Sequence, residues 1–306
     1  RLPSYEARQS CTTETGGALS AATAGLNITK KSLWKTFGID QQKPRQTSKV
    51  AGAVKARQTV CLHLTNGHPF SRGAQYMFIR EKLNYEPQPL PDRADMSDAD
   101  SSAAARAYLE HMQTRHTVRD FSSRPVPREI LEDCIRTAGL APSGANHQPW
   151  HFALIGNPEM KAAIREAAEV EERKFYESSA HDEWIKALEP IGTGPHKPHL
   201  EDAPWLIVVF AERYGVFDDG TRYKNYYVPE SVGIASGFLI TAIHNAGLVC
   251  LTHTPNPMGF LTRICKRPTS NKPLMILAVG HPASNARIPL VAKRKKSLDE
   301  ILSHFE

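Results

Sequence analysis

Residues Gly139–Trp150, with the sequence GLAPSGANHQPW, decide the fold of this 306-residue chain, because they join an amphipathic helix to a hydrophobic strand. Pro142, Gly144 and Pro149 are incompatible with regular secondary structure across this stretch. A connection of this composition at the entrance of a strand can present backbone N–H groups to a ligand. A surface turn is the plainer interpretation of the same residues.

The elements on either side of this stretch predict the class of fold. The apolar residues between Ile130 and Ala138 recur at helical spacing, and Gly139 ends that helix. Further helices are expected at 101–113, 158–178, 184–188, 229–246, 258–266 and 298–305, and short apolar strands at 150–156, 205–210, 248–252 and 274–280. The strand at 205–210 is apolar on both faces, which is typical of a central strand. Four buried strands among helices favour an α+β fold, a three-layer α/β/α sandwich.

The composition is that of an ordinary globular protein, with 41% hydrophobic and 23% charged residues. No apolar run approaches the roughly 20 residues that a membrane-spanning helix needs. The five cysteines are widely spaced without a C-x-x-C pair, so neither a disulfide framework nor a zinc site is indicated. We therefore expect a soluble, cytoplasmic protein with no membrane partner.

The net charge of +6 is unevenly distributed. Residues 1–74 carry eleven Lys/Arg against three Asp/Glu, and residues 75–306 carry 27 against 29. The basic balance thus belongs to the N-terminal segment, and we expect no nucleic-acid partner for the rest of the chain. We interpret 1–74 as a disordered basic segment, 75–100 as a Pro-rich linker or arm, and 101–306 as the folded domain.

The signatures of hydrolases, metalloproteases, P-loop proteins and Rossmann dinucleotide sites are absent from the sequence. A bound cofactor is the remaining carrier of chemistry. Arg115, Thr117 and Arg119 alternate along an extended segment, so they can share one face and serve a phosphate and a polar ring edge together. An ordinary solvated Arg pair is the alternative interpretation.

The segment Arg115–Phe121, together with the Pro-Ser-Gly-Ala-Asn spelling at 142–146, resembles the flavin-dependent nitroreductase superfamily, in particular its iodotyrosine deiodinase branch. The resemblance covers residues 105–304 and implies a domain-swapped homodimer with FMN at the interface. It assigns four groups of residues to FMN binding: Arg115, His116, Thr117, Val118 and Arg119; Pro142, Ser143 and Gly144; Thr252, His253 and Thr254; and Arg294. His253 departs from the Thr that the branch has at this position.

The resemblance also implies a lid that clamps an amino acid. Its pattern is a Glu, a Tyr four residues later and a Lys about twenty residues beyond, and Glu172, Tyr176 and Lys197 match it. On a helix, Glu172 and Tyr176 share one face, where the carboxylate can take an ammonium while the phenol and Lys197 take the carboxylate of a zwitterion. A solvated helix face and an exposed loop Lys are the alternative.

The activity implied by the resemblance is reductive dehalogenation of a halotyrosine, with release of halide and tyrosine. The Ala145 N–H would hold the substrate phenolate, and Thr254 would hydrogen-bond flavin N5, which favours one-electron transfer. NAD(P)H or a reductase would supply the electrons. Two alternatives remain: a general FMN nitroreductase acting on nitroaromatics or quinones with NAD(P)H, and a flavin-free binding protein whose basic tail is the working part.

Overall fold

The computed structural model describes residues 85–90, 95–178 and 182–306. The predicted disordered segment 1–74 lies outside the described residues, as does part of the arm at 75–100. The α-helices are α3 (Asp98–Gln113), α4 (Arg128–Gly139), α5 (Pro158–Glu177), α6 (Asp182–Leu188), α7 (His199–Asp202), α8 (Val228–Asn245) and α9 (Gly259–Ile264). The strands are β1 (Trp150–Ile155), β2 (Trp205–Glu212), β3 (Tyr214–Val216), β4 (Arg222–Lys224), β5 (Val249–His253) and β6 (Asn271–Gly280). Short 3-10 turns are η1 (Gly144–Asn146), η3 (Glu189–Ile191), η4 (Leu290–Lys293) and η5 (Leu298–Glu300).

The four strands predicted from their apolar sequences form one antiparallel sheet, in the order β1-β2-β6-β5. Its register places Ala153 opposite Val208 and Val208 opposite Ile276. β2 therefore lies between two other strands, which confirms its predicted central position. Its residues from Leu206 to Phe210 are fully buried, because helices cover both faces of the sheet.

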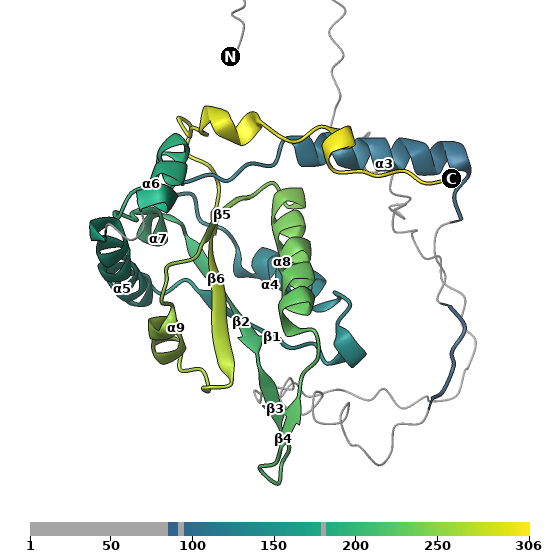
Figure 1. Cartoon of the computed structure of the whole chain (residues 1–306), viewed down its shortest axis with the longest axis horizontal. Coiled ribbons are helices and arrows are strands. Elements are labelled where there is room, and N and C mark those ends of the chain that lie inside the picture. The colour runs from purple at the N-terminus through teal and green to yellow at the C-terminus, as the bar shows by residue number, and fades with distance from the viewer. Residues whose placement is uncertain (1–84, 91–94, 179–181) are drawn as a thin grey trace, which may run out of the picture. The chain divides into compact units, whose positions relative to one another are not determined.

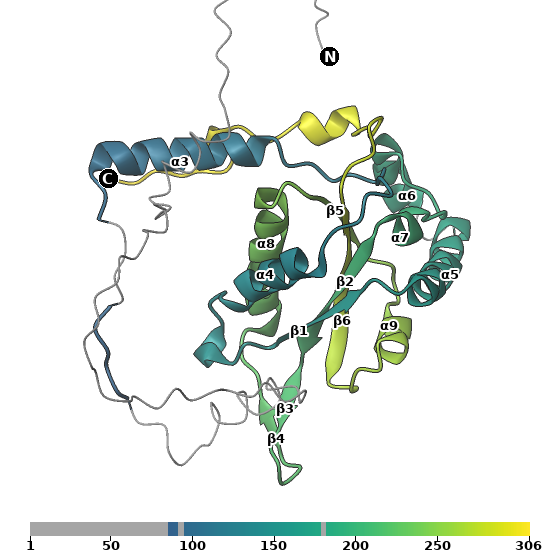
Figure 2. The same ribbon diagram turned by 180° about the vertical axis from the view of Figure 1, so that it is seen from behind.

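Alternate residues of each strand contact different helices, because successive side chains of a strand point to opposite faces. Ile207, Val209, Leu277 and Val279 pack with α4 and α8 on one face, and Leu206, Val208, Phe210 and Ile276 pack with α5, α7 and α9 on the other. Figures 1 and 2 show the two groups of helices on either side of the sheet. The α+β class predicted from the sequence is confirmed. Among the described residues, no helix is long and apolar enough to cross a membrane.

Two parts of the chain differ from the prediction. The expected terminal helix at 298–305 was wrong beyond its first turn: the structure has only the 3-10 turn η5, capped by Ser297 and Glu300. Ile301, Leu302 and Phe305 are exposed, and an isolated helix of eight residues is marginal without packing. The small hairpin β3–β4 was not predicted as strands, although its turn at Asp218-Asp219-Gly220 was. Three-residue strands are too short to give a period-2 signal.

Candidate active site

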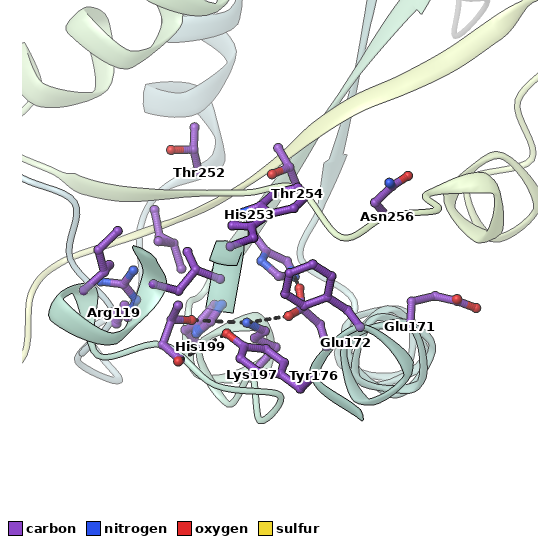
Figure 3. Close-up of a pocket in the computed structure, with 16 residues that line it drawn as sticks. Arg119, Glu171, Glu172, Tyr176, Lys197, His199, Thr252, His253, Thr254 and Asn256 are labelled. Carbon is purple, nitrogen blue, oxygen red and sulfur yellow. Dashed lines mark hydrogen bonds and ion pairs between the residues drawn. The ribbon is translucent and has the colours of Figure 1, made fainter. Parts of the chain in front are cut away.

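A cavity of about 230 Å³ opens between β5, α5 and the connection from α6 to α7 (Figure 3). Its lining brings together seven of the residues singled out in the sequence: Arg119, Glu172, Tyr176, Lys197, Thr252, His253 and Thr254. These residues come from four separate segments of the chain, so the cavity exists only in the folded domain.

The predicted clamp residues contact one another in this cavity. Lys197 Nζ lies 3.0 Å from Glu172 Oε2, and the two side chains are only 4% and 13% exposed. Thr193 joins them: Lys197 Nζ donates to its Oγ1 at 3.2 Å, and the Tyr176 hydroxyl donates to its carbonyl oxygen at 3.2 Å. Burial, and then the Glu172 charge, raise the pKa of Tyr176, so its phenol is neutral at pH 7. The cavity thus contains a carboxylate, an ammonium and a phenol O–H within reach of one small ligand.

The backbone of the loop before α7 fixes Lys197 in this position. The Lys197 N–H donates to Glu169 Oε1 at 2.8 Å, one helical turn before Glu172 on α5. Glu169 Oε1 also accepts a hydrogen bond from Arg165 Nε at 2.9 Å. The loop is therefore tied to the same face of α5 that carries Glu172 and Tyr176, which is why Lys197 meets Glu172, 25 positions earlier in the sequence.

β5 contributes to the cavity from both of its faces. Thr252 and Thr254 are exposed, whereas His253, between them, is buried and turns toward α5. His253 Nε2 lies 3.8 Å from Glu172 Oε1, and its ring meets that of His199 edge to face at 5.6 Å between centroids. Burial, reinforced by the charge of Lys197, lowers the pKa of His253 to about 3 and that of His199 to about 4. Both imidazoles are neutral at physiological pH.

The segment from Arg115 to Arg119 is tied to β5 by its backbone. Thr117 forms a parallel bridge with Cys250, and the Val118 N–H donates to the Cys250 carbonyl at 3.3 Å. Arg119 reaches the clamp cavity, whereas Arg115, His116 and Val118 line a second cavity of about 240 Å³ next to Val249 and Cys250, at the start of β5. β5 therefore carries both cavities.

The C-terminal basic run lies beside this second cavity. Burial lowers the pKa of His116, and the charges of Arg115, Lys295 and Lys293 lower it further. Arg294 lies between those two lysines, directly after η4, and is exposed. Half-buried Arg115 and the exposed Lys293 and Lys295, from two ends of the domain, thus lie around His116.

The loop at Pro142–Ala145 is not part of the clamp cavity. The Gly144 N–H donates to Ser231 Oγ at 3.2 Å, and a Cβ on Gly144 would lie 2.6 Å from the Tyr226 carbonyl oxygen. The loop is therefore packed on the first turn of α8, and Figures 1 and 2 place that turn on the side of the domain away from α5 and α6. Ala145 has φ 50°, and Asn146 and Gln148 also have positive φ. Left-handed non-glycine residues are strained and cluster at functional sites.

Residues 112–281 match the model of the nitroreductase family, which is more than half of the chain. The chain belongs to the nitroreductase family. An iodotyrosine deiodinase of Haliscomenobacter hydrossis is 52% identical over 190 residues, which cover 62% of this chain and 86% of that protein. An iodotyrosine deiodinase of Nematostella vectensis is 39% identical, over 72% of this chain and 83% of that protein. A crystal structure of oxidised iodotyrosine deiodinase bound to FMN and 3-iodo-L-tyrosine has a TM-score of 0.53 at 29% identity, covering 65% of this chain and 98% of that one.

The residues of this nitroreductase family member suit FMN in two respects. The cations around His116 can serve a phosphate, which carries about two negative charges and prefers clustered Arg and Lys. Thr252 in β5 and Thr254 directly after it are both exposed, and the Thr117 bridge connects this strand to the segment that carries Arg115 and Arg119. Cations that could bind a phosphate and hydroxyls that could meet a ring edge are therefore neighbours along β5.

Two members of the site were not predicted. Thr193 contacts both Lys197 and Tyr176, but its position in Gly192-Thr193-Gly194-Pro195 indicated only a connection. His199 lines the cavity from the first residue of α7. A histidine two residues after the expected clamp Lys was the available signal, but a four-residue helix gives no periodicity to orient it.

The buried histidines predict a loss of stability in mild acid. Burial lowers the pKa of His151 and His199 to about 4 and of His253 to about 3, below the 6.5 of an unfolded chain. Below pH 6.5 these histidines bind protons in the unfolded chain but not in the folded chain. The free energy of unfolding therefore falls by up to about 1.4 kcal/mol per pH unit for each histidine.

Urea denaturation at pH 7.5, 6.0 and 5.0 measures this slope. The His199→Gln variant should show a shallower fall than the wild type, because one of the buried titrating groups is gone. An equal slope in the two proteins would mean that His199 does not contribute.

Proposed function

We propose that the protein is an FMN-dependent reductive dehalogenase of halogenated tyrosines that releases halide and tyrosine. The observation that carries the proposal is the clamp. Glu172, Tyr176 and Lys197 line the same cavity as Thr252 and Thr254, and Lys197 forms an ion pair with Glu172. The deiodinases similar to this chain over most of their length agree with it.

The clamp recognises the amino-acid end of the substrate. Glu172 takes the ammonium, and Lys197 and the Tyr176 hydroxyl take the carboxylate, so the zwitterion inserts into an ion pair that already exists. Desolvation strengthens these charge-assisted hydrogen bonds, because Lys197 and Glu172 are largely removed from water. A nitroaromatic or a quinone lacks both charges and leaves the clamp unused.

The reaction replaces a ring C–X bond by C–H and consumes two electrons and one proton for each halide released. FMN, once bound and reduced by NAD(P)H or a reductase, would supply the two electrons. Thr254 offers a hydroxyl to the flavin N5, and the Ala145 N–H holds the substrate oxygen as phenolate. The cavity and the lid exclude water from the reacting ring.

The proposal includes a homodimer with FMN at the interface. Pro142–Ala145 and the clamp cavity lie on different sides of one chain, so a second copy would bring the two sets together. α8 supports this arrangement: Ile234 and Phe238 are 43% and 39% exposed, and a Cβ built on the preceding Gly233 or Gly237 would meet no atom within 4 Å. An exposed apolar helix face with small residues suits close packing against another helix. The exchange of chain ends between the two subunits and the three-layer α/β/α sandwich belong to the same proposal.

Titration of the oxidised, FMN-bound protein with 3-iodotyrosine tests the function. We expect flavin fluorescence to be quenched by 3-iodotyrosine at micromolar concentration, and far less by tyrosine or a nitrophenol, because the clamp and the phenolate site must both be filled. If the nitrophenol quenches the flavin fluorescence and 3-iodotyrosine does not, the result would favour a nitroreductase of broader specificity. A purified protein without the flavin absorption near 450 nm would contradict both.

A further inference from the structure

His253 is the residue of the cavity whose role the clamp does not explain. Its Nε2 is buried and, within the described part of the chain, has no hydrogen-bond partner; the same holds for His199 Nε2. His253 is 8% exposed and lines the cavity between Thr252 and Thr254. A buried polar atom without a hydrogen-bond partner is costly, so a state of the protein in which it is satisfied is favoured.

The group that faces this nitrogen is the clamp carboxylate. Glu172 Oε1 lies 3.8 Å from His253 Nε2, while the other oxygen of Glu172 is held by Lys197 at 3.0 Å. At 3.8 Å there is no hydrogen bond, but a shift of about 1 Å would make one. Figure 3 shows the imidazole reaching from beneath β5 toward Glu172.

Burial and the charges around the ring fix its form. Burial first, and then the charges of Lys197 and Arg119, oppose a positive charge on His253, so the imidazole stays neutral and carries a single N–H. A carboxylate oxygen opposite Nε2 repels a lone pair and attracts a hydrogen, which favours the tautomer with the proton on Nε2. His253 therefore points an N–H at Glu172.

We propose that His253 is a positioning residue, which donates its Nε2–H to Glu172 when an α-amino acid occupies the cavity. The proposal rests on the proposed function. The carboxylate of the amino acid competes with Glu172 for Lys197 Nζ, and Glu172 then turns toward the incoming ammonium. The His253 N–H holds the second oxygen of Glu172 in that orientation.

The test compares two variants of the FMN-bound protein on two substrates. His253→Phe keeps a ring without a donor, and His253→Gln keeps an N–H donor. The substrates are 3-iodotyrosine and 3-(3-iodo-4-hydroxyphenyl)propionate, which lacks the ammonium. We expect His253→Phe to raise the KM for 3-iodotyrosine about tenfold, since hydrogen bonds to charged groups are worth at least that factor, and to change the KM for the propionate less than about twofold. His253→Gln should restore most of the affinity for 3-iodotyrosine.

A purely structural role would affect both substrates alike, and that result would overturn the inference, as would an unchanged KM for 3-iodotyrosine in His253→Phe. If the wild-type holoprotein binds no 3-iodotyrosine, the proposed function fails and this inference with it, so the two failures are distinguishable. Should His253→Phe fold poorly, ¹⁵N-histidine NMR of the wild type decides: the His253 Nε2–H signal should move downfield with 3-iodotyrosine and stay in place with the propionate.

Discussion

Replacing Glu172 by Gln is expected to raise the KM for a halotyrosine about 30-fold or more while FMN remains bound. Truncating one partner of a buried, hydrogen-bonded charge pair costs about 2–5 kcal/mol, and 2 kcal/mol corresponds to about 30-fold. The Gln amide can still accept a hydrogen bond from the ammonium but supplies no charge. It also leaves Lys197, 4% exposed, without its counterion. Lys197→Gln should have an effect of similar size, because it removes the cation for the substrate carboxylate.

The matched control is Glu177→Gln, an exposed carboxylate on the same helix that does not line the cavity. Steady-state kinetics with 3-iodotyrosine and FMN content from the absorption spectrum measure both effects. An unchanged KM in both clamp variants would contradict the clamp. If the Glu172→Gln variant loses FMN, the Glu172 carboxylate instead contributes to cofactor binding.

The sequence predicted the clamp because its residues follow the order and spacing of a known pattern, and helical geometry places Glu172 and Tyr176 on one face. It could not predict that Lys197 pairs with Glu172, because that contact depends on the Lys197 N–H donating to Glu169 across the loop. Periodicity also located all four strands of the sheet, yet their order requires contacts between segments about 50 to 75 residues apart, such as β1 with β2 and β2 with β6.

The motif pattern grouped Thr252, His253 and Thr254 as one flavin contact, whereas the strand places them on two faces. Successive side chains of β5 alternate, so His253 turns to Glu172 while the two threonines stay exposed. Alternation was visible in the sequence, but not which face α5 would cover. Sequence reasoning was weakest where side chains meet across elements, and Thr193 and His199 were missed for that reason.

Replacing Phe238 by Glu on α8 is expected to yield a monomer that has lost FMN and dehalogenase activity but retains its fold. Phe238 is 39% exposed on a face shared with Ile234, and neither Gly233 nor Gly237 has an atom within 4 Å of the position of a Cβ. If this face packs against a second copy, a twofold axis buries the new carboxylate twice, and an unpaired buried charge costs several kcal/mol. In water, by contrast, an exposed Glu on a helix costs little, so the single chain should stay folded.

Val216→Glu is the matched control, because Val216 is also apolar and 53% exposed but lies on the β3–β4 hairpin. Analytical ultracentrifugation, far-UV circular dichroism and the FMN-to-protein ratio report association, fold and cofactor separately. A monomeric Phe238→Glu variant that keeps FMN and full activity would show that one chain completes the site. A variant that remains dimeric would place the interface away from α8. Loss of FMN together with the dimer would support a flavin site that needs both subunits.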